Sequence, residues 1–176
     1  MLSKKIVDLL NNQIQKEFHS AYLYLSCANY YDEKGLKGFA NWFHVQVKEE
    51  VDHALYLRAY LVSNNQKVEL FDIEAPTETF NNFKDPLELA LKHEEYVTKL
   101  IHEIYHAALE EHDYRTKDFI TWFVTEQGEE EENCTELIQN YDLFAGTPQG
   151  LYQLDKDMGA RTYVQSATVA AALTKN

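Results

Sequence analysis

Four stretches of this chain carry apolar residues at intervals of three or four, and a carboxylate interrupts each of these stripes. That spacing is typical of helices that bury one face. The stripes begin at Ile6, Phe39, Leu87 and Phe119, and the interrupting residues are Glu17, Glu50, Glu94 and Glu130. An unpaired ionised carboxylate is costly in a dry core. The pattern therefore predicts four core-facing helices and a positive charge that compensates the acids between them.

Turn signals set the expected helix boundaries. The chain has only 6 Gly and 3 Pro, which favours long uninterrupted helices. We expect helices over about residues 3–32, 39–62, 86–111 and 116–144, with a turn at His112 and Asp113. Ser3 and Asp85 are the expected N-caps of the first and third helices, and Pro86 suits a first helical position.

The segments between and after these helices define the expected topology. Residues 64–84 form a long connection, which is enough to run the length of a bundle and make helices two and three parallel. A break at residues 145–150 precedes a short fifth helix at about 151–158. We therefore expect one all-α domain: a four-helix bundle over 1–145, the fifth helix within 146–160, and a tail over 161–176 to which no structure is assigned.

The polar residues on the stripes recur with a shift of 77 positions. The first set is Glu17, Glu50 and His53, and the second is Glu94, Gln127 and Glu130. The same shift relates Glu49 to Glu126 and Asp52 to Glu129. We interpret this as a two-fold internal repeat of a helix pair, with a polar set projecting inward from each half.

This arrangement suits a pair of metal ions. Residues three apart on a helix share one face, about 5–6 Å apart at Cβ, so Glu50 and His53 can bind or flank one ion. Carboxylates with a single imidazole favour iron, manganese or zinc. We assign bridging roles to Glu50 and Glu130, with Glu17 and His53 on one ion and Glu94 on the other. Paired ions of this kind lie about 3.5–4 Å apart.

Each of these residues also has an ordinary interpretation. Glu17 would be a surface residue if the helical phase were wrong, and His53 alone is more often structural than a ligand. Glu94 would be exposed if it paired with Lys92 or Lys99. The agreement of four helices in spacing, phase and repeat favours metal binding over these separate alternatives.

The charge balance limits the classes of molecule that the protein is expected to bind. The chain has 29 Asp and Glu against 16 Lys and Arg, a net charge of -13, which argues against nucleic acid and anionic membranes and favours cations. No run approaches the roughly 18 apolar residues of a membrane span, and the N-terminus leads into an amphipathic pattern rather than a signal core. Cys27 and Cys134 lie within helical patterns without metal-type spacing. We expect buried thiols and a cytoplasmic protein.

Five motifs together resemble the ferritin-like superfamily, and within it the non-haem bacterial ferritins, over roughly residues 3–158. They are Glu17, the Glu50-Val51-Asp52-His53 run, Lys92-His93-Glu94, residues 126–131, and the Gly150-Leu151-Tyr152 turn. The resemblance implies an iron-storage protein with ferroxidase activity. It would oxidise Fe(II) with O2 or peroxide and deposit Fe(III) oxyhydroxide in a hollow shell of twenty-four subunits, with the fifth helix at the four-fold axes.

The resemblance also implies residue roles. Glu17, Glu50 and His53 would hold the first iron, and Glu94 and Glu130 the second, with Gln127 beside it. A third iron site is implied at Glu49, Glu126 and Glu129. Tyr24 and Trp122 match aromatic residues next to the centre, where they would supply electrons or limit radical damage; plain core packing is the alternative.

The chain departs from related patterns in three places. Many di-metal carboxylate bundles carry Glu-x-x-His on both helix pairs, whereas the second pair here reads Gln127-x-x-Glu130. An amide oxygen is a weaker ligand, so we expect the second ion to be held less tightly. The haem-binding methionine of bacterioferritins would fall at Val51, so we expect no haem. Gly128, inside a helix, would allow a bulge or a close approach to the backbone.

Two other functions stay open. One is a di-metal peroxidase or oxidoreductase of the same fold without storage, and the other is a metal-free helical interaction protein. The acidic cluster of Glu49, Glu126 and Glu129 favours storage, because chemistry on one substrate does not need a third site. The carboxylates at core positions disfavour the interaction protein, because an ordinary bundle would place Leu or Ala there.

Overall fold

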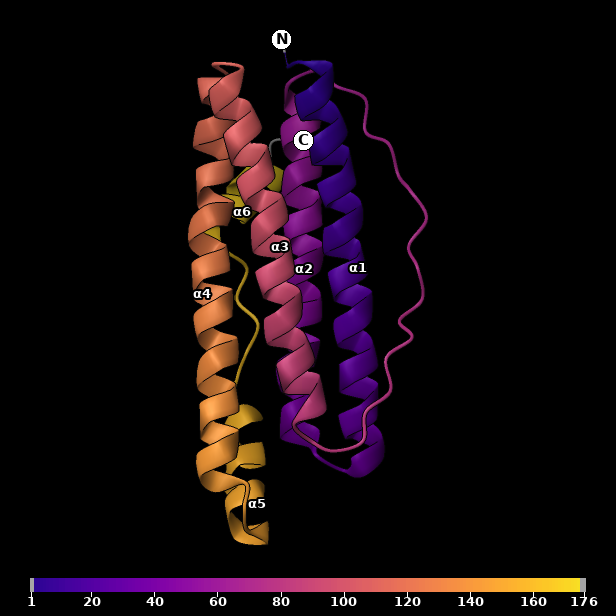
Figure 1. Cartoon of the computed structure of the whole chain (residues 1–176), viewed down its shortest axis with the longest axis vertical. Coiled ribbons are helices and arrows are strands. Elements are labelled where there is room, and N and C mark those ends of the chain that lie inside the picture. The colour runs from indigo at the N-terminus through magenta and orange to yellow at the C-terminus, as the bar shows by residue number, and fades with distance from the viewer. Residues whose placement is uncertain (1, 175–176) are drawn as a thin grey trace.

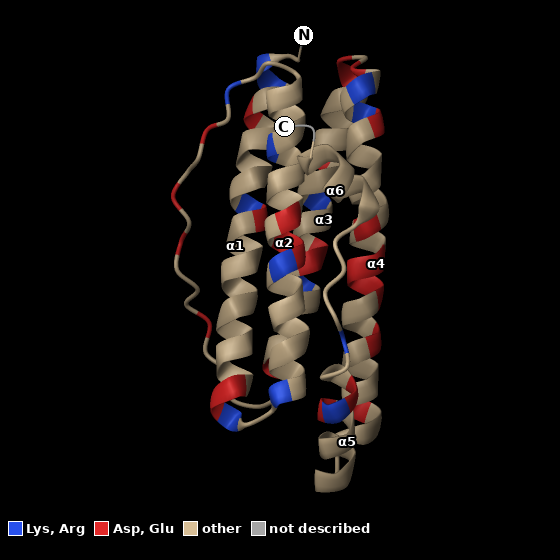
Figure 2. Ribbon diagram, turned by 180° about the vertical axis from the view of Figure 1, so that it is seen from behind, with Lys and Arg blue, Asp and Glu red and all other residues tan. Residues whose placement is uncertain are grey.

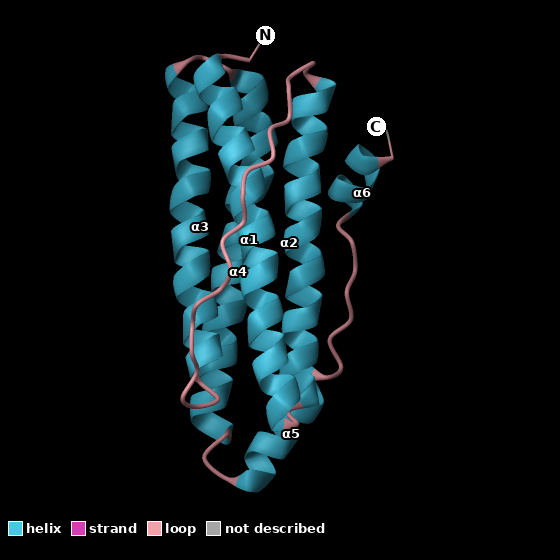
Figure 3. Cartoon of the chain, turned by 90° about the vertical axis from the view of Figure 1, so that its right-hand side faces the viewer, coloured by secondary structure: helices cyan, strands magenta, loops and turns pink. Residues whose placement is uncertain are grey.

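The computed structural model describes residues 2–174, and within this range every regular element is a helix (Figure 3). The helices are α1 Lys4–Lys34, α2 Lys37–Ser63, α3 Asp85–Glu110, α4 Tyr114–Phe144, α5 Pro148–Met158 and α6 Ala167–Leu173. The predicted all-α class is confirmed. None of the described helices is both long enough and apolar enough to cross a membrane.

The four long helices form a bundle of two hairpins. Helix α1 packs against α2, and α3 packs against α4. Residues 64–84 run along the outside of the bundle from the end of α2 to the start of α3, so α2 and α3 point the same way (Figure 1). This confirms the long crossover and the parallel pair that the sequence predicted.

Local signals fix the helix ends, with corrections of one to three residues. Ser3 Oγ accepts a hydrogen bond from the Ile6 backbone N–H at 3.2 Å, as expected of an N-cap. Helix α1 continues to Lys34, because Gly35 adopts the left-handed conformation (φ 80°) that ends helices readily. Helix α5 begins at Pro148, because Thr147 Oγ1 accepts from the Gly150 N–H at 3.1 Å.

The N-cap predicted at Asp85 is wrong. Lys84 is the N-cap, and Asp85 is the first residue of α3. The Asp85 carboxylate instead accepts hydrogen bonds from the backbone N–H groups of Asn81 and Asn82, at 2.7 and 3.3 Å. Asp85 thus satisfies backbone donors at the end of the crossover instead of capping α3.

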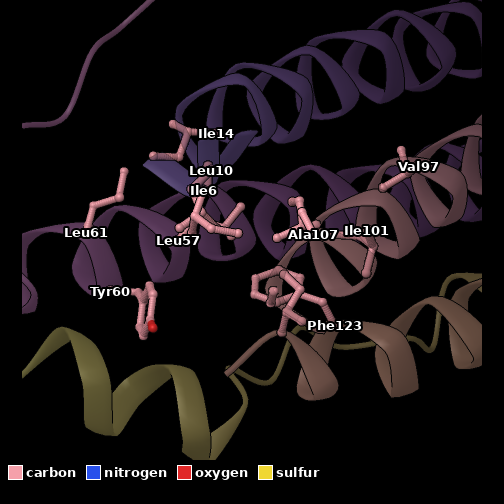
Figure 4. Packing of buried hydrophobic residues seen from close by; sticks show 14 residues of the cluster. Ile6, Leu10, Ile14, Leu57, Tyr60, Leu61, Val97, Ile101, Ala107 and Phe123 are labelled. Carbon is pink, nitrogen blue, oxygen red and sulfur yellow. The ribbon is translucent and has the colours of Figure 1, made fainter. Parts of the chain in front are cut away.

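Two apolar clusters fill the bundle, with the predicted polar residues between them. One cluster lies toward the start of α1 and includes Ile6, Leu10, Leu57, Ile101 and Phe123 (Figure 4). The other lies toward the end of α1 and includes Tyr24, Tyr31, Phe39, Phe43 and Leu137. On each long helix the sequence passes from one cluster to the other across the polar positions. The apolar clusters therefore seal a polar layer at mid-bundle.

The C-terminal tail has structure that the sequence did not predict. After α5, residues 159–166 return along the bundle, and α6 packs against α2 (Figure 2). Val169 in α6 is buried. This returning segment passes a region in which both α2 and α4 carry acidic residues, drawn in red (Figure 2). The tail thus lies over the mid-bundle layer rather than extending away from the bundle.

Candidate metal centre

All six polar residues of the internal repeat lie in the core. The exposed fractions are 0% for Glu17, 2% for Glu50, 3% for His53, 1% for Glu94, 3% for Gln127 and 4% for Glu130. These values exclude the surface positions considered for Glu17 and Glu94. The two halves of the repeat therefore converge on one buried layer, with a member from each long helix.

Glu17, Glu50 and His53 form the tightest group. Each offers one ligand atom, and these atoms all lie within 4.8 Å of one another. His53 Nδ1 lies 3.6 Å from Glu50 Oε2, one helical turn away on α2. Two carboxylates and an imidazole at this separation suit a borderline cation such as iron, manganese or zinc.

The second half of the repeat is joined mainly by hydrogen bonds. Glu94 accepts from the Tyr24 hydroxyl and from Gln127 Nε2, the latter at 3.0 Å. Glu130 Oε2 accepts from Gln46 Nε2 at 2.9 Å. Gln127 therefore donates to Glu94 through its amide nitrogen and orients that carboxylate.

Unpartnered oxygens mark the interior of this layer. Glu17 Oε2, Glu50 Oε1 and Gln46 Oε1 are fully buried and have no hydrogen-bond partner among the described residues. Buried polar atoms are nearly always paired, and each exception costs free energy. Two of the three belong to the group that includes His53, so the donor set fits a cation that would satisfy these oxygens.

Burial controls the protonation of the layer. It raises the pKa of Glu17, Glu50 and Glu94, and it raises the pKa of Glu130 to about 8, with the charge of Glu94 adding to the effect. Burial alone would lower the pKa of His53, but Glu126 and Glu50 outweigh it, and that pKa lies well above its usual value. Burial therefore favours the protonated form of these acids, and a cation that binds them would compete with those protons.

Two aromatic residues lie next to the centre. The Tyr24 ring is buried, its hydroxyl donates to Glu94, and burial raises its pKa well above the usual value. The Trp122 ring stands edge-on to His53, with ring centroids 5.5 Å apart. Both residues thus lie beside the candidate centre, and each also packs with one of the apolar clusters.

The three residues of the predicted third site are not brought together equally. Glu49 and Glu126 line one small pocket with His53. Glu49 Oε2 pairs with Arg161 Nη2 at 2.7 Å, and Glu126 Oε1 lies 3.8 Å from His53 Nε2. Glu129 is exposed and forms no hydrogen bond or ion pair with the other described residues.

Sequence reasoning missed three residues that contact this layer. Gln13 Nε2 donates to Glu17 Oε1 at 3.0 Å, and Gln46 donates to Glu130. Each glutamine lies four positions before an acidic site residue, a same-face spacing that could have identified it. Arg161 had no such signal, because it lies in the unassigned tail. The bulge expected at Gly128 is absent, since α4 is continuous there and Gly128 is exposed.

Comparison with known proteins agrees with this fold and site. The family model for the ferritin-like domain matches residues 7–144. The bacterial non-heme ferritin of Campylobacter jejuni is 36% identical over 156 residues, covering 89% of this chain and 93% of that protein. A probable bacterial non-heme ferritin-like protein of Haemophilus influenzae is 34% identical over 90% of this chain and 96% of its own length.

Solved structures give the same result. A closed form of the Archaeoglobus fulgidus ferritin, engineered by site-directed mutagenesis, superposes with a TM-score of 0.91 at 38% identity, covering 93% of this chain and all of that one. The open-pore ferritin of the same archaeon superposes with a TM-score of 0.90 over 92% of this chain. The chain belongs to the ferritin family. Iron storage is the function of this family, and Glu17, Glu50 and His53 form a candidate di-iron site in keeping with it.

Proposed function

We propose that this protein oxidises Fe(II) at two adjacent positions inside the bundle and stores the Fe(III) product in a hollow shell of its own copies. The observation that carries the proposal is the buried group of Glu17, Glu50 and His53, which has unpartnered carboxylate oxygens facing no protein donor. Membership of the ferritin family makes iron the expected cation.

The residues take different roles at the two iron positions. Glu17, Glu50 and His53 hold the first Fe(II), while Glu94 and Glu130 hold the second. Glu50 and Glu130 bridge the two ions. Each of the two Fe(II) ions gives up one electron and becomes Fe(III). With two protons, these two electrons reduce dioxygen to hydrogen peroxide, or reduce hydrogen peroxide to two water molecules.

Neighbouring residues position these ligands. Gln127 and Tyr24 both donate to Glu94, so they fix the orientation of a second-site ligand. Gln13 and Gln46 do the same for Glu17 and Glu130. Because Gln127 uses its amide nitrogen for this contact, it supports the second site rather than serving as the ligand that the glutamate of a second Glu-x-x-His pair would provide.

The proposal also covers the size of the shell, a third ion site, haem and the location of the protein. The shell contains twenty-four copies, and a third ion binds transiently at Glu49, Glu126 and Glu129 before the oxidised iron leaves. Val51 stands where a haem ligand would be needed, so the chain takes no haem. Cys27 and Cys134 are buried free thiols, which supports a cytoplasmic location.

Aerobic iron loading tests this function. Fe(II) is added to the assembled protein, and both the oxidation rate and the iron retained per subunit after gel filtration are measured. We expect retention far above the two or three ions that the centres alone could hold. Retention of only two or three ions per subunit would instead support a di-metal oxidoreductase without storage.

A variant tests the first iron position. We expect His53→Ala to slow the fast oxidation phase by about tenfold or more, because a lost ligand weakens metal binding at least as much as a lost supporting contact. His102→Ala is the matched control, since His102 is exposed on α3. Unchanged oxidation in an intact His53→Ala assembly would remove His53 from the site.

A further inference from the structure

The C-terminal segment lies against the same side of the centre as His53 and Glu126. Gln165 Nε2 donates to Asp52 Oδ1 at 2.9 Å, and the Tyr163 hydroxyl donates to the other oxygen of Asp52. Val169 in α6 is only 1% exposed. These contacts hold residues 161–173 against α2, over the positions next to His53.

A small pocket separates this segment from the metal centre. Its lining is Glu49, Asp52, His53, Trp122 and Glu126 from the bundle, with Val164, Ser166 and Val169 from the tail. It has about 40 Å³ of space for water-sized molecules, enough for a water or a small cation. The tail therefore forms one wall of a pocket whose other wall includes a proposed iron ligand.

Arg161 contacts Glu49, a residue of the pocket lining, and is held there by several further contacts. Its guanidinium pairs with Glu49 at 2.7 Å, donates to the Trp42 carbonyl at 3.3 Å, and lies over the Trp42 ring at 4.8 Å from the centroid. Its own backbone carbonyl accepts from Asn41 Nδ2 at 2.9 Å. Such multiple contacts distinguish it from a mobile surface arginine.

The positive charge of Arg161 affects how a cation can bind to Glu49. Glu49 and Glu126 line the same pocket, and burial together with the nearby charge of Glu126 raises the pKa of Glu49. Arg161 supplies a positive charge to Glu49, whereas His53 is the one basic partner of Glu126 among residues 2–174. An iron ion binding both carboxylates must therefore compete with Arg161.

We propose that residues 161–173 form a displaceable cover over this side of the iron centre, with Arg161 as the cation that competes for Glu49. Iron that passes by Glu49 and Glu126 displaces Arg161, and loss of that contact loosens the contacts of the tail with Asp52. The inference rests on the proposed function, because the passing cation is the iron of the ferroxidase centre.

Calorimetric titration with Co(II), a divalent probe that air does not oxidise here, tests the competition. We expect wild-type protein to bind two ions per subunit tightly and a third more weakly. Arg161→Gln should lower the Kd of the third, weaker Co(II) site about tenfold, because one competing charge-assisted hydrogen bond is lost. The affinities of the two tight sites should stay unchanged. Arg58→Gln, an exposed change of the same charge on α2, should match wild type.

Hydrogen exchange tests the cover in the wild-type chain and does not depend on how the variant folds. Saturating Co(II) should speed exchange in residues 161–173 at least threefold while the four long helices keep or gain protection. Unchanged tail exchange, or an Arg161→Gln titration that overlays wild type or lacks a third class, would overturn the cover. Absence of any Co(II) binding in either chain would overturn the proposed function as well.

Discussion

At the scale of single residues, the stability of the metal-free protein depends on the protonation of its buried acids. Glu130 is the clearest case, because burial and Glu94 raise its pKa from 4.5 to about 8. Between these values the unfolded chain releases the proton while the folded chain keeps it. Metal-free folding therefore becomes less favourable as pH rises through this window, and the contribution levels off above the folded pKa.

This reasoning predicts a pH-dependent stability for the metal-free protein. We expect the free energy of unfolding to fall between pH 5 and pH 8, by up to about 1.4 kcal/mol per pH unit from this group. Glu130→Gln should flatten that decline, because an amide has no proton to lose. Urea unfolding at fixed protein concentration measures both, with the exposed Glu132→Gln as control. An equal slope in Glu130→Gln and wild type would contradict the assignment.

At the scale of elements, the start of α2 depends on α5. Leu36, the N-cap of α2, makes no side-chain capping bond. Asp155 Oδ1 from α5 instead accepts from the backbone N–H groups of Gly38 and Phe39, at 2.8 and 3.0 Å. A side chain 116 or more positions away thus caps the helix that carries Glu50 and His53. The fifth helix stabilises the bundle as well as extending it.

Close packing at this contact predicts a sensitive glycine. A Cβ at Gly38 would lie 1.5 Å from the Asp155 carbonyl oxygen, so Gly38→Ala must displace α5. We expect a loss of about 1–3 kcal/mol, typical of overpacking, and faster hydrogen exchange in α5. The control is Gly128→Ala, where no atom lies within 4 Å of the new Cβ and a gain of up to about 1 kcal/mol is expected. Wild-type stability in Gly38→Ala would show that α5 does not pack here in solution.

At the scale of the whole molecule, the crossover and α1 expose several large apolar side chains. Leu70, Phe71 and Ile73 on the crossover are 75%, 49% and 43% exposed, and Tyr22 on α1 is 48% exposed. Phe18 and Ile73 also line two neighbouring hollows, both between the crossover and α1, and Val47 of α2 contributes to one of them. Contiguous exposed apolar residues usually mark an interface. We expect a second copy of the chain to cover this face in the proposed shell.

Assembly is therefore expected to depend on this apolar face. Light scattering with size exclusion should give a mass near twenty-four subunits for wild type. Ile73→Asp should give much smaller species, because a buried unpaired charge opposes association. Thr77→Asp, on the same crossover and exposed, should assemble normally. A full-size shell from Ile73→Asp would place the subunit contacts elsewhere.

The sequence by itself determined the helices, the crossover and the buried polar layer. Apolar periodicity is local, so it identifies the face of a helix that points inward without knowledge of its neighbours. The 77-residue repeat then related Glu17, Glu50 and His53 to Glu94, Gln127 and Glu130. All six lie in the core, because every stripe on which they stand faces the same interior.

Only the tertiary structure decided how these residues are supported and covered. The hydrogen bond from Gln46 to Glu130 joins helices α2 and α4 across 84 positions, and no sequence pattern encodes that pairing. The tail is rich in Ala and Thr, and this composition does not predict a particular structure for it. Arg161, Tyr163 and Gln165 find their partners only once α5 has turned the chain back along α2. Long-range contacts between weakly patterned segments depend on the assembled bundle, so they cannot be predicted from local periodicity.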